Sequence, residues 1–313
     1  MMRSRLRGYH GIDIGGTKIE LVAFHDDEHG LREVHRERIP TPGTDFAEFV
    51  QSMQALVARA DVELDMRAAV GIGLPGIVDT VSGRQLSSNV PALNGRVVAS
   101  ALQEALQRPL VIGNDCQCFA LSEADGGAAH ALPSMFGAII GTGAGGGYCV
   151  NGRLLRGANG IAGEWGHWPM PAALLQQYQL PLLPCACGRS GCLERYVSGP
   201  GMSQLHRHLG GDGAPPLAIA AQAAAGSQLA QQTLALHLDL LAHALATLVI
   251  TLDPHAIVLG GGLSQMSHLY QQLPAAVKRH LFTGVIVPPI LPPAYGDAGG
   301  ARGAALLARQ LYP

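Results

Sequence analysis

A strand, a glycine-rich turn and a second strand occur twice along this chain, and this recurrence limits the possible folds more than any other feature. The first copy spans residues 9–24, with its turn at Gly15 and Gly16. The second spans residues 136–150, with glycines at 141, 143 and 145–147. The two copies are similar in architecture and are not a short-period repeat. They therefore indicate two related lobes that face each other across a cleft.

Both lobes are predicted to mix strands with helices. In the first, strands are expected at residues 9–14, 19–24, 69–74 and 110–112, and helices at residues 46–60, 97–106 and 116–123. The polar residues between Gly30 and Gly43 are interpreted as a loop. In the second, leucines every three or four residues from 234 to 248 predict a long buried helix, followed by a strand at residues 256–259.

A length of 313 residues and a hydrophobic content of 48% allow two modest cores. We therefore predict an α/β fold with a small first domain at residues 1–116 and a larger second domain at residues 117–298. The second domain carries an inserted cysteine-rich loop at residues 181–194. The alanine-rich residues 299–313 are expected to form a helix that packs back on the first domain.

The charge balance argues against nucleic acid and membrane surfaces as partners. Charged residues make up 14% of the chain and the formal net charge is −2, so no basic field is present to attract either. The most apolar long segment, residues 234–252, is interrupted by His237, Asp239 and His243, which argues against a membrane span. No signal peptide is expected, and six cysteines without one indicate reduced thiols in the cytoplasm.

The first glycine turn predicts contacts with a phosphate group. The backbone amides of Gly15 and Gly16 can approach a phosphate closely, and Thr17 and Lys18 can donate to its oxygens. Asp13 can hold magnesium through water. Taken alone, the segment is equally compatible with an ordinary hairpin. Its glycine spacing and the strand that follows exclude a Walker A loop.

Two further glycine segments predict more of a nucleotide site. Gly141, Thr142, Gly143, Gly145 and Gly146 follow an apolar strand, and a second strand follows them. A dinucleotide-binding fingerprint would require a helix at that point. A third surface is predicted at Gly260, Gly261 and Gly262, for which a tightly packed helix N-terminus is the alternative.

Asn114 and Asp115 lie between a predicted strand and a predicted helix, where an aspartate commonly caps helical amides. The catalytic alternative is that Asp115 is a general base. A phosphoryl acceptor needs a carboxylate within hydrogen-bond reach of the hydroxyl that it deprotonates, and strand ends facing a cleft suit that role.

Cys185, Cys187 and Cys192 predict a metal site, with His167 as the nearest upstream histidine to complete four ligands. Four protein ligands leave no open position, so the metal is expected to be structural zinc. Reduced cysteines without metal are the alternative. Glu164 and Glu194 lie close to these ligands in sequence. Carboxylates suit sugar hydroxyls, although solvated surface positions are the commoner fate of glutamates.

The remaining histidines, such as His25, His206 and His255, show no partner pattern and are interpreted as surface residues. Cys116, Cys118 and Cys149 are interpreted as small apolar core residues.

Together these motifs resemble the bacterial ROK family, named for repressors, open reading frames and kinases. The resemblance covers the whole chain. It implies a two-domain actin-like (ribonuclease H-like) ATPase fold, ATP with Mg²⁺, one structural Zn²⁺, a homodimer as a common state, and Asp115 as the general base toward a sugar 6-hydroxyl. The implied zinc ligands are His167, Cys185, Cys187 and Cys192. The implied sugar site comprises Gly76, Asn89, Asn114, Asp115, Glu164, His167 and Glu194.

The resemblance also indicates a substrate. Residues 88–92 and 295–300 look most like bacterial N-acetylglucosamine kinases, whereas residues 124–128 and 163–167 look closer to fructokinases of the family. N-acetylglucosamine is the predicted substrate, and fructose and glucose are the alternatives. Cys116 and Gln117 stand where the family often has Ala-Asn.

Two other functional classes are disfavoured. A sugar-responsive DNA-binding regulator of this family would carry an added N-terminal helix-turn-helix domain, and only eight residues precede the first predicted strand. A sugar-binding module without catalysis does not explain Asp115 and the phosphate hairpin.

Overall fold

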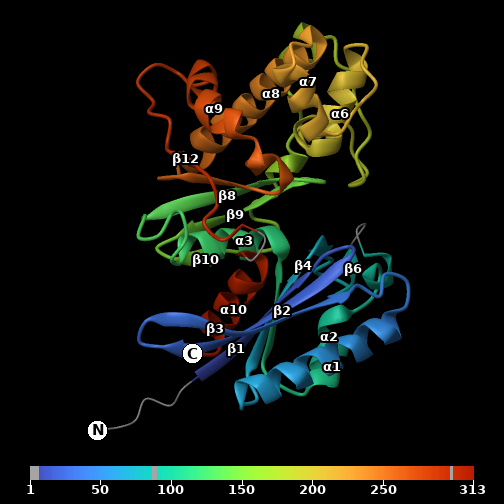
Figure 1. Cartoon of the computed structure of the whole chain (residues 1–313), viewed down its shortest axis with the longest axis vertical. Helices are drawn as coiled ribbons and strands as arrows, with labels where there is room; N and C mark the ends of the chain where they lie inside the picture. The colour runs from blue at the N-terminus through green and yellow to red at the C-terminus, as the bar shows by residue number, and fades with distance from the viewer. Residues whose placement is uncertain (1–6, 87–89, 297–298) are drawn as a thin grey trace. The chain divides into compact units, whose positions relative to one another are not determined.

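The computed structural model describes residues 7–86, 90–296 and 299–313. The chain divides into two compact units, whose elements are labelled in Figure 1. Unit 1 comprises Met1–Glu123, Arg153–Ala162 and Asp297–Pro313, and unit 2 comprises Ala124–Gly152 and Gly163–Gly296. Unit 1 keeps α3 (Asp115–Ala124) as far as Glu123, beyond the boundary predicted at residue 116, and it also includes Arg153–Ala162, which the sequence assigned to the second domain.

The sheet of unit 1 combines a meander with parallel strands. Its order is β3-β2-β1-β4-β7. β1 pairs with β2 in antiparallel fashion and with β4 in parallel fashion, and β4 is parallel to β7. The carboxyl ends of β1, β4 and β7 therefore meet at one edge, where ligands of open α/β sheets commonly bind. The strands are β1 (Arg7–Ile14), β2 (Lys18–Asp27), β3 (Gly30–Pro40), β4 (Ala69–Leu74) and β7 (Leu110–Asn114).

The prediction of a loop after Gly30 is wrong, because residues Gly30–Pro40 form β3, an edge strand that pairs with β2. Its polar composition agrees with its position, because none of its residues is buried. Arg36 and Arg38 contact the buried carboxylate of Glu20 at 2.8 and 2.7 Å. Charged side chains are a common feature of edge strands. Because they interrupt the alternation of hydrophobic and polar residues in β3, the sequence pattern does not predict this strand.

Helices cover the sheet of unit 1. α1 (Phe46–Leu64) is capped by Asp45, whose side chain accepts hydrogen bonds from Ala47 N and Glu48 N, and it packs against α2 (Val98–Leu106). α10 (Gly299–Leu311) packs on β1 and β4. A Cβ at Gly11 or Gly71 would lie 1.8 Å from a backbone oxygen of α10, so glycine is required at both contacts. The remaining short elements are β5 (Ile77–Val78), β6 (Gln85–Leu86) and η1 (Pro91–Leu93).

The second sheet repeats the local pattern of the first. β8 (Ser134–Ile140) pairs with β9 (Ala144–Val150) in antiparallel fashion and with β11 (Ile257–Gly260) in parallel fashion, as β1 does with β2 and β4. The full order is β10-β9-β8-β11-β12, with β10 (Arg153–Leu155) and β12 (Ile290–Leu291) at its edges. The strand–turn–strand recurrence predicted from the sequence is therefore confirmed.

The long helix α8 (Gln228–Leu252) lies at the centre of the helices of unit 2. It contacts α6, α7 and α9 and ends at Asp253, whose φ is 42°. Among the described residues it is the one helix long and apolar enough to cross a membrane, but 67% of its apolar window is buried inside the protein. It is therefore a core helix. The other helical elements are η2 (Trp165–His167), α4 (Ala172–Gln177), α5 (Glu194–Val197), α6 (Gly199–His208), α7 (Pro216–Ala224), η3 (Gly262–Gln265) and α9 (Ser267–Arg279).

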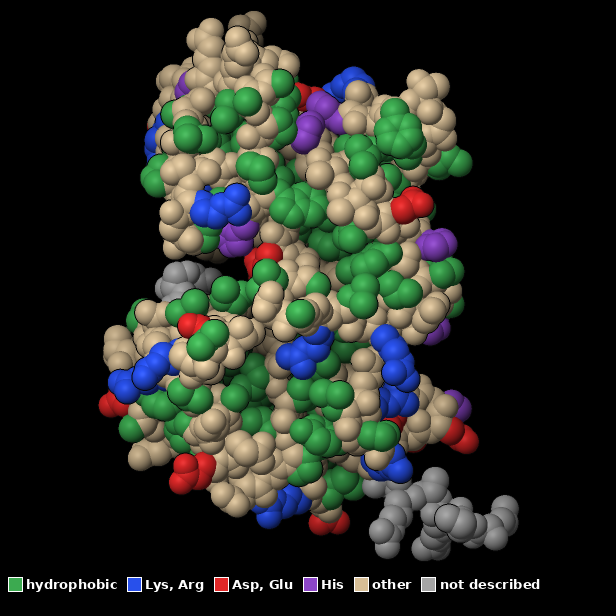
Figure 2. Space-filling view, turned by 180° about the vertical axis from the view of Figure 1, so that it is seen from behind, with side chains coloured by type: hydrophobic (Ala, Val, Ile, Leu, Met, Phe, Trp, Pro, Cys, Tyr) green, Lys and Arg blue, Asp and Glu red, His purple; other side chains and the backbone are tan. Residues whose placement is uncertain are grey.

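One face of the molecule is shown with side chains coloured by type in Figure 2. Lys and Arg side chains occur there in small groups separated by uncharged surface. This distribution agrees with the 14% content of charged residues in the chain.

Candidate active site

Asn114 organises the strand end that carries the predicted base. Its Oδ1 accepts hydrogen bonds from Cys116 N at 2.9 Å and Gln117 N at 3.3 Å, so Asn114 is the residue that caps α3. Its Nδ2 donates to the carbonyl of Gly76 at 3.1 Å. The structure therefore brings together Gly76, Asn114 and Asp115, three of the residues predicted for the sugar site.

Asp115 opens α3 directly after β7. Its carboxylate accepts a hydrogen bond from Cys116 N at 2.9 Å. Burial among protein atoms raises the pKa of Asp115 above its ordinary value, and the hydrogen bonds from Cys116 only partly oppose this effect. A carboxylate with a raised pKa is a stronger base, as general base catalysis requires.

Asp13 lies near Asp115 at the same sheet edge. A Cβ built at Gly73 would be 3.4 Å from Asp13 Oδ1 and 3.6 Å from Asp115 Cα, so Gly73 lies beside both acidic residues. A Cβ at Gly300 would be 2.6 Å from Asp13 Cγ. The carboxylate of Asp13 therefore lies against the first turn of α10, where the helix dipole favours a negative charge.

The predicted phosphate hairpin is a tight turn between β1 and β2. Gly15 N donates to the carbonyl of Lys18 at 2.9 Å, and Gly16, Thr17 and Lys18 are exposed. Thr41, which sequence analysis missed, holds the turn from outside: its Oγ1 donates to the carbonyl of Gly15 at 2.8 Å and its N to that of Thr17 at 3.1 Å. The position of Thr41 directly after β3 was hidden because β3 was not predicted.

A cavity of about 760 Å³ lies within unit 1, beside Gly76 and Asn114. Gln117 and residues 156–160 also line it. Gln117 Nε2 donates to the carbonyls of Gly160 and Ala162 at 3.1 and 2.9 Å. Gln117, which stands where the family often has asparagine, thus stabilises the loop at residues 156–162 through these two hydrogen bonds.

Unit 2 contains a second cavity, of about 670 Å³. Gly141, Thr142 and Gly262 line it, together with the N-terminal residues of α6. Gly199 N donates to the carbonyl of Gly141 at 2.8 Å. Gly261 has a φ of 77°, and a Cβ there would be 2.7 Å from the carbonyl of Ile140, so only glycine suits this crossing. Backbone amides and a helix N-terminus at one cavity suit an anionic group.

Five predicted glycines do not line this cavity: Gly143, Gly145, Gly146, Gly260 and Gly261. Gly145 and Gly146 lie inside β9, opposite Ile139 and Ala138, so the sheet takes up this stretch of backbone. Gly143 accepts a hydrogen bond from Gly141 N at 2.9 Å. Gly260 ends β11 opposite Ile139 of β8. Sequence analysis missed several other lining residues, because they come from segments that no glycine motif marks: Ser203, Arg207, Pro216, Leu217 and Gln265.

His206, expected at the surface, is 3% exposed. Its Nδ1 accepts a hydrogen bond from Gly213 N at 3.3 Å and lies 3.3 Å from Asp212 Oδ1. The loop after α6 folds over the imidazole and buries it, so the surface interpretation of His206 is wrong.

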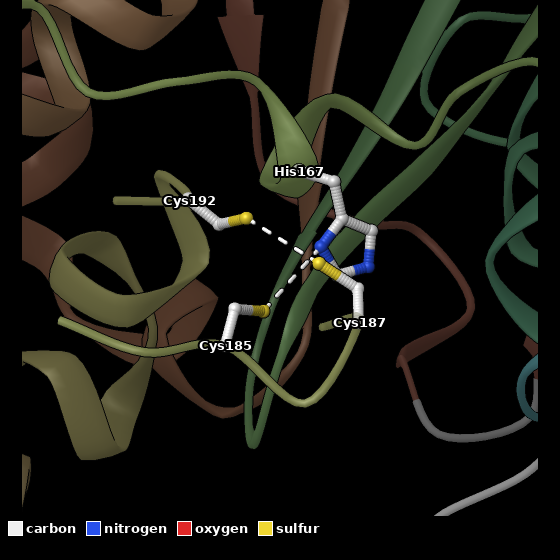
Figure 3. A group of neighbouring side chains, drawn as sticks. All are labelled: His167, Cys185, Cys187 and Cys192. Atoms are coloured by element: carbon white, nitrogen blue, oxygen red, sulfur yellow. Dashed lines mark hydrogen bonds between the residues drawn. The ribbon is translucent and has the colours of Figure 1, made fainter. Parts of the chain in front are cut away.

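The predicted metal ligands converge in unit 2, as Figure 3 shows. The ligand atoms of His167, Cys185, Cys187 and Cys192 all lie within 4.8 Å of one another. The Cys185 Sγ to His167 Nδ1 distance is 3.7 Å and the Cys187 Sγ to Cys192 Sγ distance is 3.5 Å. Zinc bonds of about 2.0–2.3 Å in a tetrahedron would separate ligands by roughly 3.3–3.8 Å, so this donor set fits zinc.

The thiols of the cluster influence one another. Burial and the neighbouring Cys187 and Cys185 raise the pKa of Cys192 to about 12. Although partial burial opposes it, the Arg189 backbone N–H and the adjacent thiols lower the pKa of Cys187. Three thiolates this close repel one another, and a bound cation would relieve that repulsion.

The two glutamates predicted for the sugar site lie beside the metal ligands. Glu164 Oε2 is 3.8 Å from His167 Nε2, and Glu194 Oε1 is 4.0 Å from Cys185 Sγ. The other oxygen of Glu194 accepts a hydrogen bond from Ala144 N at 2.9 Å. Asn89, also predicted for the sugar site, lies outside the described residues, as do residues 88, 297 and 298 of the two substrate-indicating segments.

Comparison with known proteins gives a consistent result. The model of the ROK family matches residues 9–311. The chain is 44% identical to the N-acetylgalactosamine kinase AgaK of Shewanella sp. strain ANA-3, over 97% of each chain. It is 41% identical to the N-acetyl-D-glucosamine kinase of Photobacterium profundum, over 96% of this chain and 98% of that one.

Solved structures agree with these matches. The ROK hexokinase of Thermus thermophilus is similar with a TM-score of 0.86 and 29% identity, over 97% of this chain and 98% of that one. A ROK family glucokinase of Streptomyces griseus, in complex with glucose and AMPPNP, is similar with a TM-score of 0.72 and 27% identity, over 97% and 99%.

Proposed function

The chain belongs to the ROK family and has its two-domain actin-like ATPase fold, and we propose that it is an ATP-dependent kinase for the 6-hydroxyl of N-acetyl-D-glucosamine. The products are N-acetylglucosamine 6-phosphate and ADP, and the role is amino-sugar salvage. The observation that carries the proposal is Asp115, a carboxylate with a raised pKa at a parallel strand end, beside the linked Asn114 and Gly76.

In the proposed reaction, Asp115 accepts the proton of the 6-hydroxyl as its oxygen attacks the γ-phosphorus of ATP, and ADP leaves. Gly76, Asn89, Asn114, Glu164, His167 and Glu194 are proposed to hold the sugar. Asp13 is proposed to hold Mg²⁺ through water, and the exposed hairpin Gly15–Lys18 to contact the phosphates. Positioning and electrostatic stabilisation then account for most of the rate.

The nucleotide is proposed to occupy the 670 Å³ cavity of unit 2. Gly141, Thr142 and Gly262 present backbone at its wall, and the N-terminus of α6 favours the charge of phosphate. Leu217 and Pro216 supply apolar surface that suits a base. The AMPPNP complex of the Streptomyces griseus relative supports ATP as the phosphate donor.

His167, Cys185, Cys187 and Cys192 are proposed to hold one zinc ion. Four protein ligands leave no position for water, so the ion would organise the loop that carries Glu194 without taking part in the chemistry. None of the six cysteines forms a disulfide, which supports a reducing compartment, and we propose a cytoplasmic location. Its partners are proposed to be the sugar and ATP, with a homodimer as the assembly.

N-acetyl-D-galactosamine is the second candidate substrate, because a relative at 44% identity is named a kinase for that sugar. The two sugars differ only in the configuration at C4, so the 6-hydroxyl chemistry is the same for both. Glucose and fructose rank lower, because the relatives above 40% identity named here are N-acetylhexosamine kinases.

The test is an ADP-release assay with ATP and Mg²⁺ against N-acetylglucosamine, N-acetylgalactosamine, N-acetylmannosamine, glucose and fructose at equal low concentrations. The highest kcat/KM is expected with N-acetylglucosamine. A lead for N-acetylgalactosamine would retain the mechanism and replace the substrate. No turnover with any hexose would overturn the kinase proposal.

A further inference from the structure

The metal ligand His167 belongs to η2, which is packed directly on the start of β9. Trp165, 1% exposed, donates its indole N–H to the carbonyl of Gly145 at 2.7 Å. A Cβ at Gly166 would lie 2.0 Å from the carbonyl oxygen of Ala144, and one at Gly163 would lie 2.2 Å from that of Gly146. The backbone at Gly163 and Gly166 therefore packs directly against the backbone of β9, with no side chain between them.

A second connection runs from the cysteine ligands to the same point. Glu194 follows Cys192 by two residues, and its Oε2 accepts the hydrogen bond from Ala144 N at 2.9 Å. A Cβ at Gly143 would be 2.6 Å from that oxygen. Leu193 N also donates to the carbonyl of Trp168 at 2.9 Å. This bond connects the segment that carries Cys192 with the segment that carries His167. Both reach β9 at Ala144.

Ala144 is the first residue of β9 and the last position of the turn Gly141–Ala144, whose first two residues line the cavity of unit 2. Gly141 N donates to the carbonyl of Gly143 at 2.9 Å, which closes the turn, and Gly141 and Thr142 form part of the cavity wall. Glu194 therefore sits behind the wall at which the nucleotide is proposed to bind. The contact of Glu194 with Ala144 N gives this carboxylate a structural role in addition to its proposed contact with the sugar hydroxyls.

We infer that the Cys₃His site positions the turn Gly141–Ala144 for the nucleotide, with Glu194 as the positioning residue. The inference rests on the proposed function only in taking the 670 Å³ cavity as the nucleotide site. The carboxylate acts through one oxygen that accepts the Ala144 N–H, and the metal holds the segment that presents it. Removal of either loosens the turn, so nucleotide affinity falls even when no sugar is present.

The experiment measures the dissociation constant of AMPPNP with Mg²⁺ by calorimetry, without sugar, for the full-length zinc-containing protein. Glu194→Ala leaves the Ala144 N–H without its acceptor and is expected to weaken AMPPNP about tenfold. Glu194→Gln keeps an oxygen acceptor and is expected to stay within about threefold of the unmodified protein. Zinc content, measured for each variant by mass spectrometry, is expected to stay at one ion per chain.

Glu104→Ala is the matched control. Glu104 is an exposed glutamate of α2 in unit 1, and it belongs neither to the proposed sugar and nucleotide sites nor to the metal-ligand cluster. The substitution is expected to leave the AMPPNP dissociation constant unchanged. Chelated protein is expected to lose affinity at least as strongly as Glu194→Ala.

Equal AMPPNP affinity of the unmodified protein and Glu194→Ala, with zinc retained, would overturn the positioning role and leave the kinase proposal intact. An equal loss in Glu194→Ala and Glu194→Gln would also overturn it, because the acceptor oxygen would then not be the cause. Failure of the unmodified protein to bind AMPPNP would instead overturn the nucleotide site itself. If chelation unfolds the protein, the three variants still decide the outcome.

Discussion

Among single residues, Asp115 is the one on which the proposed chemistry depends most directly. Its carboxylate is held by Cys116 N and its pKa is raised by burial, while Asn114 performs most of the capping of α3. Because Asn114 makes most of the capping hydrogen bonds, the carboxylate of Asp115 can still accept a proton. The raised pKa places the basicity of the carboxylate closer to neutral pH than that of an exposed aspartate.

Asp115→Asn is expected to reduce kcat by about 10²- to 10⁴-fold, because the amide cannot accept the proton of the hydroxyl. Sugar and AMPPNP dissociation constants, measured by calorimetry, are expected to change little, since asparagine keeps the shape and an acceptor for Cys116 N. A loss of only tenfold in the ADP-release assay would remove Asp115 as the base.

His237 is a buried group whose titration affects stability. It is 0% exposed, its Nε2 contacts the carbonyl of Val197 at 2.8 Å, and its Nδ1 has no hydrogen-bond partner among the described residues. Burial lowers the pKa of His237 from 6.5 to about 4. As the pH falls, the unfolded chain therefore binds the proton before the folded protein does.

This difference stabilises the fold fully above pH 6.5 and is lost as the pH falls from 6.5 toward 4, by about 3 kcal/mol in total. His237→Gln is expected to reduce the decline of Tm across this window. His29→Gln, at a side chain that is 86% exposed, is the control and is expected to follow the unmodified protein. Identical Tm profiles for all three proteins would contradict the role of His237.

At the scale of elements, α10 shows how a small-residue helix completes a sheet. It covers β1 and β4 at Gly11 and Gly71, and Gly303 on its own surface comes against the carbonyl of Cys118 in α3. The close approach also brings the first turn of α10 to Asp13. The same contact therefore contributes to the core and supports a residue proposed for magnesium.

Gly71→Ala is expected to destabilise the protein by about 1–3 kcal/mol, because the added Cβ would lie 1.8 Å from the carbonyl oxygen of Ala304 and must displace α10. Gly43→Ala serves as the comparison, since its nearest atom to an added Cβ is 3.9 Å away. Denaturant unfolding measures both. Equal stability of the two variants would show that α10 does not pack on β4 as described.

For the molecule as a whole, the two units differ in what maintains them. Unit 1 relies on its sheets and helices, whereas unit 2 adds the cluster of four candidate metal ligands on segments with little regular structure. The loop from residue 181 to 193 combines short-range hydrogen bonds, such as Gly188 N to the carbonyl of Cys185 at 3.0 Å, with a few bonds to residues 168 and 170. Such a loop is expected to depend on its metal for order.

Purified protein is expected to contain about one zinc ion per chain, and Cys187→Ser is expected to release it and lower Tm. Hydrogen exchange is expected to accelerate in residues 163–197 and to stay unchanged in β1 and β4. Cys149→Ser, at a buried cysteine outside the cluster, controls for the loss of a thiol. Metal-free protein with full stability would contradict the site.

Much of this protein is determined by local sequence signals. α10, both hairpins and the end of α8 follow from alanine content, glycine turns and Asp253-Pro254, because these signals act within a few residues. The spacing of Cys185, Cys187 and Cys192 likewise restricts three thiols to one loop, and the family resemblance is confirmed across residues 9–311.

Other features were decided only by tertiary structure. β3 forms because β2 supplies its hydrogen-bond partners, although its own residues are polar. Gly145 and Gly146 do not line the cavity of unit 2, because their backbone pairs with β8. Glu194 reaches Ala144 across 50 residues of chain, a contact that neither residue signals. Periodicity and spacing report on near neighbours in sequence, whereas these outcomes depend on which distant backbone groups meet when the sheets and the metal loop assemble.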